Sequence, residues 1–244
     1  MLETAGYAAG LGKTQAQQGL LRRFIRAFIH FFSYHLFLKH SRTAVTHVAG
    51  FRLTVPPTVF HPRIFLTSKY FANFIGQLNL AGKSVAEVGC GSGILSLAAA
   101  RAGAETVTAI DINPNAAYAA SRNARDNGLG DRVRGVCSNL MSGLAAIPLF
   151  DVIITSPPSF PGEPRDLADR AWHAGPAYRD IAALFDQARE RLAPGGVVYL
   201  LLSADSDLGR LGELIHRAHF SVHLVGRQSI FIEEFILYEL RTYS

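Results

Sequence analysis

The sequence predicts an α/β protein with a doubly wound, mostly parallel sheet of seven strands that ends in an antiparallel hairpin. Two observations support this fold class. From about residue 67, short apolar segments alternate with segments of helical periodicity, which is typical of parallel strands with helices on both faces. Near the end of the chain, two apolar segments at 220–227 and 230–241 are separated only by Gln228 and Ser229, which is hairpin spacing.

The expected elements follow one another closely through residues 64–244. A helix is expected first, over 68–79. Strands are then expected at 84–88, 106–111, 131–137, 150–155 and 196–203, and helices at 93–102, 115–127, 177–193 and 207–218. Because no linker rich in proline or serine divides this stretch, we expect residues 64–244 to form one domain.

Residues 1–63 differ from the rest in charge and pattern, and we expect them to form an N-terminal extension. The whole chain has a formal charge of +5, but these residues hold eight Lys/Arg and one acid, so they carry +7 and the remainder carries −2. A loose tail is expected over 1–19, an amphipathic helix over 20–38 and a short hairpin over 48–60 that is broken by Pro56 and Pro57.

The helix expected at 20–38 has two interpretations. Its wide apolar face either packs against the domain, or it docks on a membrane surface or over a substrate pocket. Its basic flank of Arg22, Arg23 and Arg26 suggests an anionic partner or a membrane surface for residues 20–63. A spanning helix is not expected, because the apolar stretch at 27–38 is shorter than the ~20 residues that cross a bilayer.

Composition narrows the class of protein further. Apolar residues make up 49% of the chain, which is enough for a full core. The two cysteines, Cys90 and Cys137, belong to no metal-binding spacing, so a zinc site is not expected and a reduced, cytoplasmic protein is the simplest interpretation. A signal peptide fits poorly, and no strong signature of nucleic-acid binding is present.

A glycine-rich loop, "AEVGCGSGIL" at 86–95, lies between the first strand of the expected sheet and the next helix. Glycine allows a sharp turn and a close approach of the backbone to a ligand. A dinucleotide site requires G-x-G-x-x-G, but neither Gly89 nor Gly91 begins that pattern, so a nicotinamide oxidoreductase is excluded. The pattern present, E-x-G-x-G-x-G, resembles the first motif of class I S-adenosylmethionine (SAM) methyltransferases, which have a Rossmann-like sheet.

This resemblance implies a binding site for SAM. In that family the loop wraps the methionine end of the cofactor, the acid after the second strand holds the ribose and the end of the third strand contacts the adenine. Carried onto this sequence, the implied cofactor-binding residues are Glu87, Gly89, Cys90, Gly91, Gly93, Asp111, Ile112, Asn139 and Leu140. Asp111 also has a physical argument of its own, because a strand-end carboxylate can accept hydrogen bonds from both ribose hydroxyls.

The segment "DVIITSPPSF" at 151–160 places two prolines directly after a buried strand. Prolines lack N–H donors and fix φ, so this segment can hold backbone carbonyls rigidly at the end of a strand. It resembles the Asn-Pro-Pro-Tyr motif of methyltransferases that act on planar nitrogens, including the release-factor glutamine methyltransferases. The implied catalytic residues are Ser156, Pro157, Pro158 and Ser159, and the implied substrate contacts are Phe160, Trp172 and His173.

Two positions depart from that motif and leave the acceptor open. Ser156 replaces the Asn, and Ser159 replaces the aromatic residue. We therefore expect a SAM-dependent methyltransferase acting on a nitrogen of a protein side chain or a small molecule. The alternatives are a small-molecule O-methyltransferase and a degenerate fold that binds SAM as an interaction module.

Overall fold

A computed structural model describes residues 42–59, 66–167, 169–230 and 233–243. The helix expected at 20–38 lies outside these ranges, as does most of the basic extension. Within the described ranges, no helix combines the length and the apolar character that a membrane crossing requires.

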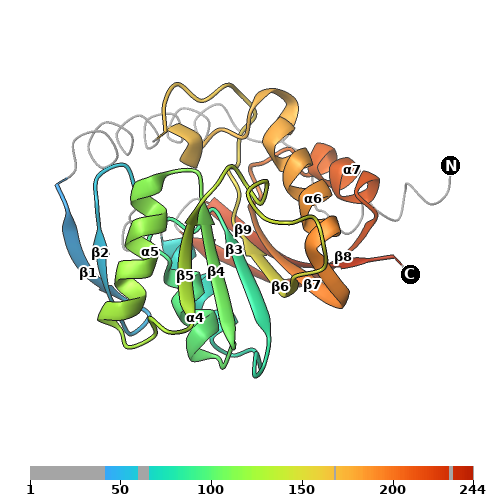
Figure 1. Cartoon of the computed structure of the whole chain (residues 1–244). Helices are drawn as coiled ribbons and strands as arrows, with labels where there is room; N and C mark the ends of the chain where they lie inside the picture. Colours follow the sequence, from blue (N-terminus) through green and yellow to red (C-terminus); the bar gives the residue numbers. More distant parts are fainter. Residues whose placement is uncertain (1–41, 60–65, 168, 231–232, 244) are drawn as a thin grey trace, which may run out of the picture.

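The centre of the fold is a seven-stranded sheet in the order β5-β4-β3-β6-β7-β9-β8 (Figure 1). Its strands are β3 (Ser84–Val88), β4 (Thr106–Asp111), β5 (Val133–Cys137), β6 (Phe150–Thr155), β7 (Leu192–Ser203), β8 (Phe220–Ile230) and β9 (Glu233–Thr242). The pairs from β5 to β7 are parallel, whereas β9 is antiparallel to both β7 and β8. The predicted fold class, including the antiparallel C-terminal hairpin, is confirmed.

Helices cover both faces of the sheet (Figure 1). They are α3 (Leu66–Ile75), α4 (Ile94–Arg101), α5 (Pro114–Asp126), α6 (Arg179–Arg191) and α7 (Leu208–Arg217). The helices α3, α4 and α5 share one apolar core with Val85 of β3, while α6 and α7 share the other with its neighbour Ala86. Successive side chains of a strand point to opposite faces, so burial of β3 on both sides explains why the adjacent residues Val85 and Ala86 are both apolar.

A separate two-stranded hairpin, β1 (Ala44–Val48) and β2 (Phe51–Val55), precedes the main sheet. The prediction of a hairpin over 48–60 broken by Pro56 and Pro57 was wrong in its boundaries. The turn is at Ala49 and Gly50, both at positive φ, and the prolines follow the second strand. Two left-handed residues match the twist of antiparallel strands, and prolines without N–H groups end the ladder instead.

The turn of the C-terminal hairpin also lies later in the chain than predicted. Gln228 and Ser229 belong to β8, where Ser229 pairs with Glu234 and Ile230 pairs with Glu233. A register shift between Leu224 and Gly226 inserts a bulge. The pairing register of the two strands sets the position of the turn, and in this register the backbones of Gln228 and Ser229 pair with β9.

The buried side chain of Asn123 on α5 joins the small hairpin to the main domain. Its Oδ1 accepts a hydrogen bond from the N–H of Thr54 at 2.8 Å, and its Nδ2 donates to the carbonyls of Thr54 and Ser92 at 3.0 and 2.9 Å. Ser92 belongs to the glycine-rich loop. One amide therefore satisfies three buried backbone groups and fixes both segments against the same helix.

Candidate active site

A cavity of about 340 Å³ opens at the carboxyl edge of the sheet. It is lined by the segments that follow β2, β3, β4, β5 and β6, by the start of α3, by residues 167 and 170–173, by α6 and by the β8–β9 hairpin. Ligands of open α/β sheets bind at this edge, and the volume lies in the range of small-molecule sites. The cavity is therefore the place where the predicted cofactor and catalytic residues should lie together.

The glycine-rich loop forms one wall of the cavity. Gly89 and Gly91 have φ values of 78° and 50°, in the left-handed region that favours glycine, and both line the cavity. A Cβ built on Gly89 would meet nothing within 4 Å, so the backbone at this point faces open space. This arrangement allows a ligand to contact the loop backbone directly.

Gly93 does not line the cavity, in contrast to its expected role in cofactor contact. It is the N-cap of α4, and a Cβ at this position would lie 2.7 Å from the Cβ of Ala120 on α5. The third glycine of the motif is therefore required for the close packing of two helices. The sequence motif alone could not separate this role from ligand contact.

Asp111 lies beside the loop at the end of β4. Its Oδ2 accepts a hydrogen bond from the N–H of Gly91, and its Oδ1 accepts one from the N–H of Asn113, both at 2.9 Å. Burial raises the pKa of this carboxyl, and the backbone hydrogen bonds partly oppose that effect. Each carboxylate oxygen has two lone pairs, so Asp111 retains acceptor capacity toward the cavity that it lines.

Glu87 is buried at the first strand of the sheet and also lines the cavity. It accepts hydrogen bonds from the backbone N–H of Ser96, at 2.7 Å, and from the Ser96 hydroxyl. Burial raises the pKa of Glu87 to about 8. Because Ser96 lies in the first turn of α4, Glu87 holds the N-terminus of the helix that follows the glycine loop.

The remaining expected cofactor residues, Cys90, Ile112, Asn139 and Leu140, all line the cavity. The Cys90 side chain is buried, and burial raises the pKa of its thiol well above the usual value. Cys90 is therefore a neutral wall residue at physiological pH, not a nucleophile.

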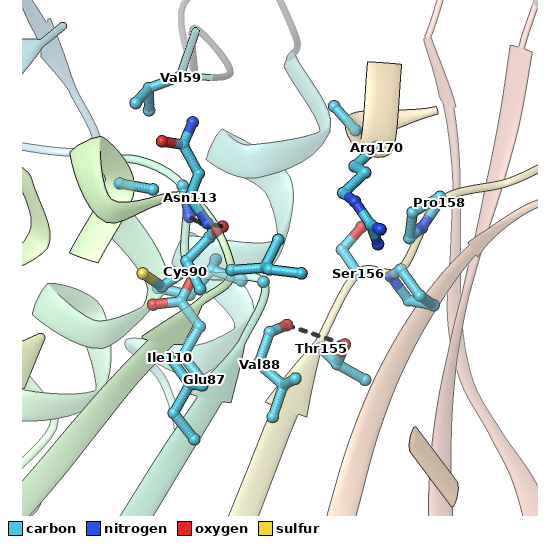
Figure 2. Close-up of a pocket in the computed structure, with 18 of the residues that line it drawn as sticks. Val59, Glu87, Val88, Cys90, Ile110, Asn113, Thr155, Ser156, Pro158 and Arg170 are labelled. Atoms are coloured by element: carbon cyan, nitrogen blue, oxygen red, sulfur yellow. Dashed lines mark hydrogen bonds between the residues drawn. The ribbon is translucent and has the colours of Figure 1, made fainter. Parts of the chain in front are cut away.

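The Ser-Pro-Pro-Ser segment faces the glycine loop across the cavity (Figure 2). It follows Thr155, whose hydroxyl donates to the carbonyl of Val88 at 3.0 Å and so ties β6 to β3 at the edge of the sheet. Ser156, Pro157, Pro158 and Ser159 all line the cavity. The Ser159 carbonyl accepts a hydrogen bond from the Tyr178 hydroxyl at 3.1 Å. Tyr178 does not line the cavity, so the Ser-Pro-Pro-Ser segment, which forms the rim of the cavity, is fixed by a side chain outside it.

Residues 160–167 and 169–175 fold back over this segment. The N–H of Phe160 donates to the carbonyl of Trp172 at 3.1 Å, its carbonyl accepts from the N–H of Ala174 at 2.9 Å, and Gly162 pairs with Gly175. Phe160 is outside the lining of the cavity, and pairing with the returning chain fixes its backbone, so its contact with a substrate stays a prediction. Trp172 does line the cavity, as expected.

His173 lines the cavity as well, and its Nδ1 lies 3.3 Å from a carboxylate oxygen of the buried Asp169. Asp169 is already held by two hydrogen bonds from the Arg165 guanidinium, at 3.0 and 2.9 Å. Burial alone would raise the pKa of Asp169, but the hydrogen bonds and charge of Arg165 outweigh it and lower the pKa. This cluster links residues within the fold-back segment and so stabilises its local structure beside the cavity.

Several cavity residues were missed by sequence reasoning. Thr58 lines the cavity from the segment after β2, where its carbonyl and hydroxyl accept hydrogen bonds from Asn113 Nδ2 at 3.0 and 3.1 Å. Asn113 could have been recognised from the sequence, because an Asn followed by Pro is a typical start of a helix, and Asn113 is the N-cap of α5. Arg170 and Asp180 carry no local signal, because only the fold-back of their segment brings them to the cavity.

The sheet order and the cavity at its carboxyl edge define the class I methyltransferase fold. Solved structures agree with this assignment at the level of the fold. A ribosomal protein L11 methylase from Lactobacillus delbrueckii subsp. bulgaricus superposes with a TM-score of 0.57 and 21% identity, covering 78% of this chain and 84% of that one. The T. thermophilus 16S rRNA N2 G1207 methyltransferase (RsmC), solved with AdoMet and guanosine, gives 0.59 and 22%, covering 83% and 50%.

Sequence comparison points to a more particular group for the cofactor half of the domain. The family model described as ribosomal protein L11 methyltransferase (PrmA) matches residues 66–156. A protein of that name from Alteromonas mediterranea is 46% identical over 67 residues, which cover 28% of this chain and 23% of the relative. The chain thus spans about a quarter of the length of this curated relative, and the family model ends at Ser156, the first residue of the Ser-Pro-Pro-Ser segment.

Proposed function

We propose that this protein is a methyltransferase that uses S-adenosylmethionine and methylates a nitrogen of a protein side chain or small molecule held at Ser156–Ser159. One observation carries the proposal. The glycine loop with Asp111 and the Ser-Pro-Pro-Ser segment form opposite walls of a single cavity. A donor bound at the first wall would therefore face an acceptor bound at the second, and such positioning lowers the barrier to group transfer.

The residues present fit the cofactor. Open space above Gly89 gives a ligand access to the loop backbone, and Asp111 offers carboxylate acceptors that suit a pair of ribose hydroxyls. Ile112 and Leu140 supply apolar surface, and the Asn139 amide supplies an acceptor, for an adenine ring. When bound, SAM supplies an electrophilic methyl group on a positively charged sulfur.

The second wall would position the acceptor. The Ser159 carbonyl is already engaged by Tyr178, whereas the hydroxyl of Ser156 is exposed and makes no hydrogen bond within the described part of the chain. The Ser156 hydroxyl and the neighbouring Pro157 carbonyl are therefore the acceptors that would grip the N–H groups of an incoming amine or amide. Hydrogen bonds to those N–H groups would direct the nitrogen lone pair toward the opposite wall, where the methyl donor would bind.

A second candidate, methylation of an oxygen, is favoured by the chemistry of Ser156. A hydroxyl can donate a hydrogen bond as well as accept one, unlike a backbone carbonyl. Ser156 could therefore orient an acceptor hydroxyl or carboxylate equally well. The methylated product distinguishes the two candidates, because mass-spectrometric fragmentation locates the methyl group on a nitrogen or an oxygen and alkali releases it only from a carboxylate ester.

The test combines binding and turnover. Purified protein is titrated with S-adenosylhomocysteine (SAH) in a calorimeter, then incubated with methyl-labelled SAM and, separately, with ribosomes and a small-molecule extract. Ribosomes are included because similar proteins are named for ribosomal targets. We expect micromolar binding of SAH, about −8 kcal/mol, and one labelled product.

The variant Ser156→Ala should lose most turnover while its SAH affinity stays normal. Ser221→Ala, on the far edge of the sheet, is the matched control. SAH binding without any transfer of label would support a degenerate interaction module instead. Absence of SAH binding would contradict the proposal altogether.

A further inference from the structure

The cavity continues past Ser156 into a region that the cofactor walls do not account for. We call this region the acceptor half; it is lined by Leu167, Arg170, Trp172, Asp180, Ile230 and Phe235. Phe235 pairs with Ser203 at the carboxyl end of β7, which places the β8–β9 hairpin on the side of the sheet away from the glycine loop. Most of these side chains are apolar, so a charged group among them calls for an explanation.

Two of these residues are charged, Arg170 and Asp180, and the cation is the guanidinium of Arg170. Figure 2 shows its side chain reaching from the fold-back segment toward Ser156 and Pro158. It makes no side-chain hydrogen bond within the described residues, and its nearest carboxylate, on Asp180, is 3.7 Å away. About a third of the Arg170 side chain is exposed. Its planar set of N–H donors is therefore available to a ligand in the cavity.

The neighbouring carboxylate is also shared with a second cation. Arg179 donates from Nε to Oδ1 of Asp180 at 3.2 Å and contacts Glu163 at 3.4 Å. Asp180 thus has its closer and hydrogen-bonded partner outside the cavity. Arg170 is left as a cation whose charge is incompletely balanced and whose donors face the site where the acceptor would sit.

We propose that the methyl acceptor is a molecule with an apolar body and an acidic group, a carboxylate or a phosphate, and that Arg170 binds that group. This inference rests on the proposed function, because it assigns the second half of the same cavity. An arginine fork matches a carboxylate or a phosphate with two parallel hydrogen bonds. The apolar lining holds the body, and the distance from Arg170 to Ser156 then selects which atom of the acceptor reaches the Ser-Pro-Pro-Ser rim.

Binding of small probes tests the inference without requiring turnover. Three probes of similar size are titrated into SAH-saturated and SAH-free protein: 3-phenylpropionate, phenyl phosphate and the neutral 3-phenylpropionamide. We expect one or both anionic probes to bind at least about tenfold more tightly than the amide. The stronger of the two anions identifies the acidic group.

Variants then assign the binding to Arg170. Arg170→Gln should weaken binding of the anionic probe at least about tenfold. Arg170→Lys should retain part of the affinity, because lysine keeps the positive charge but cannot form two parallel hydrogen bonds. Arg179→Gln is the matched control, since it removes an exposed arginine that shares the same Asp180 but lies outside the cavity lining. It should leave probe binding unchanged, and thermal unfolding of each variant checks that the fold is retained.

Each outcome bears on a different claim. Equal binding of the amide and the anions, or full anion binding by Arg170→Gln, would overturn the inference. Loss of SAH affinity in Arg170→Gln would also overturn it, because Arg170 would then hold the carboxylate of the cofactor. If wild-type protein fails to bind SAH but binds an anionic probe through Arg170, the proposed methyl transfer fails and the anion site stands.

Discussion

The carboxylate of Asp111 accepts a hydrogen bond from the backbone N–H of Gly91 at 2.9 Å. These two residues are 20 positions apart: Asp111 ends β4, and Gly91 lies in the loop that follows the adjacent strand β3. The bond couples the residue expected to hold the ribose to the loop expected to wrap the methionine end of SAM. A change at Asp111 should therefore affect both parts of the cofactor site.

Replacing Asp111 by Ala should weaken binding of SAH by about 10- to 100-fold, because a charge-assisted acceptor contributes roughly 1.5–3 kcal/mol. Calorimetric titration with SAH measures the loss. Asp131→Ala is the control: it removes an exposed acid just before β5, at the amino end of that strand, and should bind SAH normally. Normal SAH affinity in Asp111→Ala would contradict the assignment of this carboxylate to the cofactor.

Gly93→Ala should destabilise the fold by more than its backbone conformation explains. Its φ is 79°, and the added methyl would lie 2.7 Å from the Cβ of Ala120. Gly82→Ala is a matched control, because Gly82 also has a positive φ, of 69°, but a Cβ there meets nothing within 4 Å. We expect about 1–2 kcal/mol for the control and a further 1–3 kcal/mol for Gly93→Ala in urea unfolding. Equal losses would mean that α4 and α5 can move apart without cost.

The raised pKa of Glu87 predicts a loss of stability as the pH increases. Burial lifts the folded-state pKa from 4.5 to about 8, so between these values the folded protein keeps a proton that the unfolded chain releases. The stabilising contribution is complete below the unfolded pKa and is lost as pH rises toward 8, by up to about 1.4 kcal/mol per pH unit.

The variant Glu87→Gln tests this directly, because an amide of the same shape does not titrate. Urea unfolding between pH 5 and 9 should show a falling free energy of unfolding for the wild type and a flatter profile for Glu87→Gln. Parallel profiles for the two proteins would show that Glu87 keeps an ordinary pKa in the folded state.

Tyr178→Phe should lower turnover more than it lowers cofactor affinity. The buried Tyr178 hydroxyl donates to the Ser159 carbonyl and accepts from the N–H of Asp207, both at 3.1 Å. Tyr178 and the preceding Ala177 have φ values of 61° and 52°, so two strained residues place this ring behind the Ser-Pro-Pro-Ser rim. Tyr178 is thus a positioning residue.

The measurement separates binding from chemistry. We expect kcat for methyl transfer to fall with little change in the Kd of SAH, together with a loss of about 1–3 kcal/mol in unfolding free energy from the unpaired backbone groups. Tyr118→Phe, at a side chain that is 61% exposed, is the control. A stability loss with unchanged kcat would reduce Tyr178 to a structural role.

Local patterns in the sequence determined most of the main sheet. The strands at 84–88, 106–111 and 150–155 were predicted with the boundaries observed, because each is a short, mostly apolar segment that is followed within three residues by glycine or proline. Glycine spacing and strand-end position also led to Gly91 and Asp111, which the fold then brought into contact. Such features depend on neighbours in the chain, so they can be read without the fold.

The tertiary structure alone decided which side chains share the cavity. Gly93 and Phe160 belong to the motifs but are directed to helix packing and to the fold-back ladder, whereas Arg170, Asp180 and Phe235 reach the cavity from segments that carry no motif. The β8–β9 turn likewise follows from the pairing register and the bulge near Gly226. These outcomes depend on contacts between residues distant in sequence, which composition and periodicity do not encode.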